Sequence, residues 1–164
     1  MNRQKRDEKK GGLLFVILAI LTVITIVVVL LGQYVKINSY KGDIRSFSFS
    51  SGSYFGGYAK YTIERDGYDA IYTAKGYNMS DLDIRKTVDA KELDELQRII
   101  EEYKVGAWDG FDKSDDNILD GSSFSLHVEY MDGRRIDAHG YMEFPINYAM
   151  VENEFVTFFE GLGE

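Results

Sequence analysis

Four side chains in the second half of the chain are of types that bind metal ions: His127, Glu129, Asp137 and His139. They fall on two runs that alternate apolar and polar residues, so paired strands would carry all four on the face away from the core. Zinc accepts such histidine and carboxylate ligands. The alternative is a solvated face with ordinary cross-strand pairs, Glu129 with Arg135 and His127 with Asp137. Two histidines alone do not decide between these readings, so we assign no metal.

A second candidate is the segment 106–121, a long connection that holds the only tryptophan and five aspartates. Carboxylates suit Ca²⁺, which prefers oxygen ligands. The EF-hand spacing fails, however, because counting from Asp112 places Asn117 at the glycine position and Ser123 at the closing glutamate. We favour a turn-rich connection whose apolar side chains anchor it to the core. The candidate ligand or partner residues here are Trp108, Asp109, Phe111, Asp112 and Asp120.

Aromatic residues are concentrated between positions 47 and 77 of the chain. The set comprises Phe47, Phe49, Tyr54, Phe55, Tyr58, Tyr61, Tyr68, Tyr72 and Tyr77. Exposed aromatic residues of this set could bind glycan or peptide, and the candidates for this role are Tyr54 and Tyr58. The alternative is that these aromatic residues fill the core, as they usually do in strands. Nucleophilic triads, phosphate loops and dinucleotide fingerprints are absent from the sequence. We therefore expect neither an enzyme nor a cofactor.

These residues must be positioned by strands and by the turns between them. Residues 46–50 alternate with period two, and the runs 58–64 and 68–77 flank Arg65-Asp66-Gly67, a strong hairpin signal. The runs 123–130 and 134–142 form a second predicted hairpin.

The second hairpin has a predicted register, because opposing residues must share a face of the sheet. A three-residue loop, Met131-Asp132-Gly133 with left-handed Gly133, satisfies this and pairs Val128 with Ile136.

Two helices complete the domain. Asp89 is the predicted N-cap of the first, with Glu92 at the third helical position of a capping box. Its apolar stripe consists of Leu93, Leu96, Ile100 and Tyr103. The second spans Tyr148–Leu162. We predict an α+β domain: an antiparallel sheet of two hairpins plus an extra strand, with both helices packed on one face.

Before this domain, Leu13–Leu31 forms an uncharged apolar run long enough to cross a membrane as a helix. Thr22 and Thr25 are its only polar side chains, and each hydroxyl can bond a carbonyl one turn back. The sequence predicts a basic tail (1–12), a transmembrane helix (13–32), a stalk (33–43) and a domain (44–164). An uncleaved signal anchor is favoured over a signal peptide, because no small-x-small cleavage site follows.

Charge predicts the orientation of the anchor. The tail has a net charge of +3, from Arg3, Lys5, Arg6, Lys9 and Lys10 against Asp7 and Glu8. Lys and Arg favour the cytoplasmic side, so we expect a cytoplasmic N-terminus and an extracellular C-terminal domain at the plasma membrane.

The composition of the exported part excludes several function classes. The whole chain carries −8, so the remainder after the tail carries −11. Such an acidic domain repels nucleic acids, and we expect no such partner. The absence of cysteine removes thiol chemistry and lipoprotein attachment, and an exported domain without disulfides fits a bacterial envelope.

The order of motifs in the second half shows a resemblance to known exported proteins. The motifs are Trp108-Asp109-Gly110-Phe111, the run 119–126 (LDGSSFSL), the Asp132-Gly133 hairpin, and Phe144-Pro145-Ile146-Asn147-Tyr148. The chain resembles uncharacterised membrane-anchored or lipoprotein-like exported proteins of Gram-positive, often gut-dwelling, bacteria. That resemblance implies an envelope protein and assigns no activity, so no site residue carries over from it.

We therefore expect a membrane-anchored binding or interaction domain whose partner is another envelope protein. The alternative is a ligand-binding domain for cell-wall glycan or Ca²⁺, and an enzyme ranks last.

Overall fold

The computed structural model describes residues 15–32, 40–77, 81–115 and 117–164. The chain divides into two compact units, Met1–Lys36 and Ile37–Glu164, which we treat separately. In the first unit, the helix Phe15–Gly32 is long and apolar enough to cross a membrane. The hydroxyls of Thr22 and Thr25 donate to the carbonyl oxygens of Leu18 and Leu21, each over 2.9 Å, as the sequence predicts.

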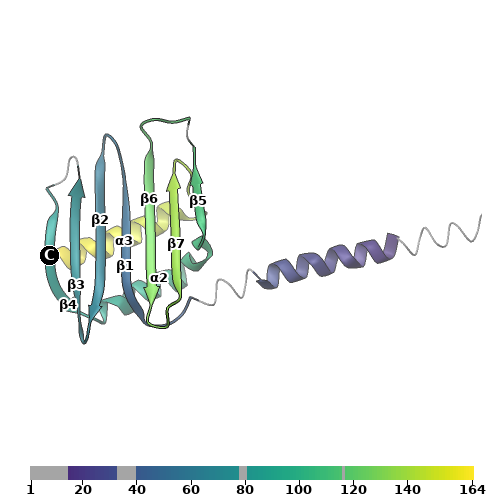
Figure 1. Cartoon of the computed structure of the whole chain (residues 1–164), viewed down its shortest axis with the longest axis horizontal. Coiled ribbons are helices and arrows are strands. Elements are labelled where there is room, and N and C mark those ends of the chain that lie inside the picture. The colour runs from purple at the N-terminus through teal and green to yellow at the C-terminus, as the bar shows by residue number, and fades with distance from the viewer. Residues whose placement is uncertain (1–14, 33–39, 78–80, 116) are drawn as a thin grey trace, which may run out of the picture. The chain divides into compact units, whose positions relative to one another are not determined.

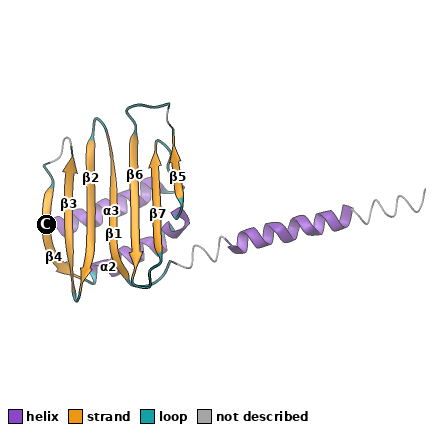
Figure 2. Ribbon diagram, in the orientation of Figure 1, coloured by secondary structure: helices purple, strands orange, loops and turns teal. Residues whose placement is uncertain are grey.

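The described residues of the second unit form seven strands, two α-helices and one short 3-10 helix (Figures 1 and 2). In chain order the elements are β1 (Ile44–Ser53), β2 (Gly57–Asp66), β3 (Asp69–Tyr77), β4 (Asp83–Asp89), α2 (Glu92–Glu102), η1 (Val105–Trp108), β5 (Phe111–Ser114), β6 (Ser122–Tyr130), β7 (Arg135–Tyr141) and α3 (Tyr148–Gly163). The strands form one sheet in the order β4-β3-β2-β1-β6-β7-β5. All neighbours are antiparallel except β5 and β7, which are parallel.

Both α-helices cover the same face of this sheet (Figure 2). The core lies between the sheet and the two helices. Along each strand, buried residues on this face alternate with residues directed to solvent. From α3, Phe155 packs edge-on against Phe47 of β1, with ring centroids 4.9 Å apart, and Phe159 stacks on Tyr61 of β2, also at 4.9 Å. Aromatic residues thus supply much of the contact between helix and sheet.

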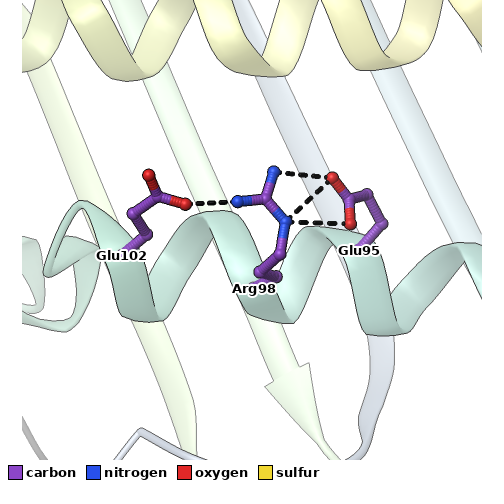
Figure 3. A network of polar contacts seen from close by, with 3 residues as sticks. All are labelled: Glu95, Arg98 and Glu102. Atoms are coloured by element: carbon purple, nitrogen blue, oxygen red, sulfur yellow. Dashed lines mark hydrogen bonds and ion pairs between the residues drawn. The ribbon is translucent and has the colours of Figure 1, made fainter.

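The solvent face of α2 carries a charged network (Figure 3). Arg98 donates from Nε to both carboxylate oxygens of Glu95, each at 3.0 Å, and from Nη1 to Glu102. Arg98 holds the pKa of Glu95 below its ordinary value. Because these side chains are exposed, the network adds little to stability.

The predicted fold class is confirmed: the domain is α+β, with a mostly antiparallel sheet. The second hairpin has the predicted register, pairing Val128 with Ile136. Gly133 has φ +83 and its N–H donates to the Tyr130 carbonyl at 3.0 Å, as a left-handed residue at the end of a three-residue loop requires.

The sheet also contains two strands that the sequence did not reveal. Residues 83–89 form β4, an edge strand, and residues 111–114 of the aspartate-rich segment form β5, the opposite edge. The predicted N-cap is wrong as a consequence. Asp89 ends β4 and accepts a hydrogen bond from the Lys91 N–H at 2.9 Å, and α2 begins only at Glu92.

The described part of the domain begins before β1. Tyr40, which the sequence assigns to the stalk, packs against the core and lies 6.2 Å from the Tyr130 ring. The predicted stalk residues 33–39 and tail residues 1–12 lie outside the described residues.

Candidate functional site

The four candidate metal ligands on β6 and β7 face away from the core. His127 Nδ1 lies 2.6 Å from an Asp137 carboxylate oxygen, and His139 Nδ1 lies 3.5 Å from that of Asp112. Glu129 lies opposite Arg135 in the register of β6 and β7, as predicted, and its carboxylate lies 3.4 Å from the Arg45 guanidinium of β1. Among the residues that the structure describes, no group of three or more histidine, aspartate or glutamate side chains could hold a metal ion.

The candidate calcium ligands of the aspartate-rich segment have different roles. Asp109 accepts a hydrogen bond from the Asp137 N–H at 3.2 Å and another from the Tyr40 side chain. Burial and the nearby Asp109 carboxylate raise the pKa of Tyr40 to about 12. Asp112 lies on β5 opposite His139, and Asp120 is exposed in the following loop. These contacts hold the segment against the sheet.

The aromatic candidates also separate into two groups. Phe47, Phe49, Tyr61 and Tyr72 are buried in the core. Tyr54 remains 63% exposed and meets Phe55 edge-on at 5.3 Å at the tip of the first hairpin. Tyr58 is half-buried, so of the two proposed binding tyrosines only Tyr54 presents most of its ring to solvent.

An open groove of about 570 Å³ lies beside β5. Its lining comes from two segments far apart in sequence: Tyr103, Lys104, Ala107, Trp108, Phe111 and Lys113 from the first, and Phe144, Pro145, Ile146 and Asn147 from the second. Two sequence candidates, Trp108 and Phe111, therefore meet here. Trp108 is only 3% exposed and forms the floor, whereas Ile146 is 91% exposed at the rim.

An aromatic cluster supports the floor of the groove. The Trp108 and Phe111 rings both approach Phe124 of β6, at 5.8 and 6.1 Å between centroids. Tyr148, at the start of α3, lies 4.7 Å from Phe124 and 4.6 Å from Phe144. Burial, with the nearby Glu152, raises the pKa of Tyr148. The floor is therefore a packed extension of the core.

Asn147 joins the two segments that form the groove. Its side-chain nitrogen donates to the Tyr103 carbonyl at 2.8 Å, and its side-chain oxygen accepts from the Trp108 indole at 3.4 Å. Its backbone is left-handed, with φ +63, a conformation that asparagine tolerates better than most residues. Lys104, the residue after Tyr103, also has a left-handed backbone, with φ +56. Two sharp changes of direction thus shape the groove.

The charged lining residues are both basic. Lys113 reaches over the Phe111 ring, with its ammonium nitrogen 5.4 Å from the centroid, and Lys104 is exposed. Within the described residues neither ammonium group forms an ion pair with a carboxylate. In a domain of strong negative charge, the groove is therefore locally positive.

Sequence reasoning missed the second wall of this groove. The asparagine that directly precedes the predicted helix, at Asn147, was a usable signal, because asparagine is favoured at helix starts.

A scan of protein-family models finds none that matches the chain, and a search of curated proteins finds no similar sequence.

Proposed function

We propose that this chain is a single-pass, membrane-anchored binding protein whose exported domain holds a segment of an envelope protein in the groove beside β5. The observation that carries the proposal is the groove itself, which is apolar over most of its lining and bordered by Lys104 and Lys113. The fitting occupant is an apolar protein segment with carboxylates beside it.

The membrane anchor supports this cellular setting. The helix Phe15–Gly32 is uncharged, and all of its described side chains are exposed, as suits contact with lipid. The basic residues before it favour a cytoplasmic N-terminus, which would export the acidic domain. A bacterial envelope accounts for a domain of this size without cysteine.

The rim of the groove argues for a protein partner. Ile146 exposes 91% of its surface. Exposed apolar surface is unfavourable in water, and this free-energy cost is removed when an apolar side chain of a partner covers it. Glycans stack on open aromatic faces, but Trp108 is buried beneath the groove. Tyr54 and Phe55 at the hairpin tip do expose their rings, so a glycan site there is the second candidate.

The test is capture of partners by the full-length tagged protein in mild detergent, with the same anchor fused to an unrelated domain as control. Ile146→Asp places a charge on the rim without altering a buried residue, so it should remove a groove partner. Leu119→Asp is the matched control, because Leu119 is 89% exposed but does not line the groove.

The proposal predicts a stoichiometric partner that is lost with Ile146→Asp and retained with Leu119→Asp. A partner that survives Ile146→Asp but is lost with Tyr54→Ala would move the binding surface to the hairpin tip. Binding of isolated cell-wall glycan that depends on Tyr54 would support the second candidate.

A further inference from the structure

We infer that β4 is a homodimerisation edge, which pairs antiparallel with β4 of a second copy of this chain. This surface is separate from the proposed binding groove, because β4 and β5 lie at opposite edges of the sheet (Figure 1). An open edge strand presents unpaired backbone groups that can template a further strand. At seven residues, β4 is long enough to do so.

The hydrogen bonds to β3 identify which backbone groups of β4 point outward. The Gly76 N–H donates to the Leu82 carbonyl at 2.7 Å, and the Ala90 N–H donates to Tyr68 at 3.1 Å. In an antiparallel ladder, bonded and non-bonded pairs alternate. Residues 84, 86 and 88 therefore also bond to β3. The N–H and C=O groups of Asp83, Arg85, Thr87 and Asp89 point away from the sheet.

These same four residues carry their side chains on the solvent face of the sheet, and all four are exposed. A two-fold axis at Thr87 would place each Arg85 opposite Asp89 of the other copy, with Thr87 opposite its own equivalent. Opposite charges and paired threonines at directly facing positions stabilise antiparallel strands. The pairing is isologous, so each Arg–Asp contact occurs twice.

The neighbouring registers that keep the backbone bonds are unfavourable. An axis at Lys86 would oppose Asp83 to Asp89 twice and Lys86 to itself, and an axis at Arg85 would oppose two arginines. Like charges directly opposite one another destabilise a ladder. The charge pattern of β4 thus selects one self-complementary register. Among the residues that the structure describes, the ionic partner of Asp89 is the exposed Lys91, at 3.9 Å.

Cysteine cross-linking in membranes tests the register directly, because the native chain has no cysteine. The full-length variants Arg85→Cys, Lys86→Cys and Thr87→Cys are oxidised under mild conditions, with Lys75→Cys on the solvent face of β3 as the collision control. Facing residues of a bonded pair have Cα atoms about 5.5 Å apart, within disulfide range. A disulfide-linked dimer should form at Thr87→Cys and only weakly in the other three.

Charge reversal in the Thr87→Cys background provides the second test. Arg85→Asp and Asp89→Arg should each lower the dimer yield by about tenfold, because each change creates two repulsive pairs. The double variant should restore the yield, which a misfolded protein could not do. Equal cross-linking at all four positions, or no effect of either reversal, would overturn the inference. Neither outcome bears on the groove, whose test depends on Ile146.

Discussion

The indole nitrogen of Trp108 donates to the side-chain oxygen of Asn147 over 3.4 Å, across 39 positions of sequence. This contact ties the segment that follows α2 to the start of α3, and the groove lies where they meet. The shape of the proposed binding surface therefore depends on one asparagine.

Replacement of Asn147 should destabilise the domain through two separable effects. Asn147→Ala loses both side-chain hydrogen bonds and also strains the left-handed backbone, so we expect a loss of about 2–3 kcal/mol in the free energy of unfolding. Asn147→Gly loses the same bonds but adopts positive φ freely, so it should be less destabilising. Urea unfolding of both variants measures the difference, and an Asn147→Gly protein that is the less stable of the two would contradict this account.

Phe159 should be a principal determinant of stability. It is fully buried between Tyr61 and Tyr72, with ring centroids at 4.9 and 5.7 Å. Phe159→Ala should therefore cost about 3–5 kcal/mol. The neighbouring Phe158 is only half-buried and provides the matched control, for which we expect a clearly smaller loss. Equal effects in thermal unfolding would show that the core is not organised around Phe159.

Stability should fall at alkaline pH. Burial raises the pKa of Tyr72 to about 12, from 10.0 in the unfolded chain. Below pH 10 the phenol is neutral in both states and contributes no pH dependence. Between pH 10 and 12 the unfolded chain loses this proton while the folded chain retains it, so stability declines by up to about 1.4 kcal/mol per pH unit.

The variant Tyr72→Phe separates this effect from the other buried tyrosines. It removes the titrating group together with the 2.9 Å hydrogen bond from Tyr72 to the Phe159 carbonyl. We expect lower stability at neutral pH but a shallower decline above pH 10. Urea unfolding at a series of pH values measures both, and an unchanged slope would assign the titration to other residues.

The orientation of the proposed membrane anchor can be measured with single cysteines, because the chain has none of its own. Asn2→Cys in the basic tail and Ser53→Cys in the domain are treated with a membrane-impermeant maleimide in intact cells. The charge asymmetry predicts that only Ser53→Cys reacts. The reverse pattern would place the domain in the cytoplasm and remove the envelope setting.

The parts of the fold that the sequence predicted are those with strong local signals. The hairpin loop Met131-Asp132-Gly133 determined the register of β6 and β7, because only one loop length keeps Val128 and Ile136 on the same face. The helix α3 was also predicted nearly to its ends, because its apolar residues repeat at helical spacing.

The parts that it missed depend on tertiary contacts. In β4, Lys86 interrupts the apolar alternation of Ile84 and Val88, so the strand has no clear period. In β5, four residues pair with β7 only because the chain returns there after η1. The groove is formed by two segments that are far apart in sequence and meet only in the folded domain. The sequence therefore identified Trp108 and Phe111 but not Ile146 or Asn147.

The central claim is that the groove beside β5 binds a protein. A photo-crosslinking amino acid at position 146 of the full-length chain, activated in intact cells, tests it most directly, with the same group at position 119 as control. The account predicts one discrete cross-linked protein from position 146 and none from position 119. Absence of any adduct at 146, or the same adducts at both positions, would contradict it.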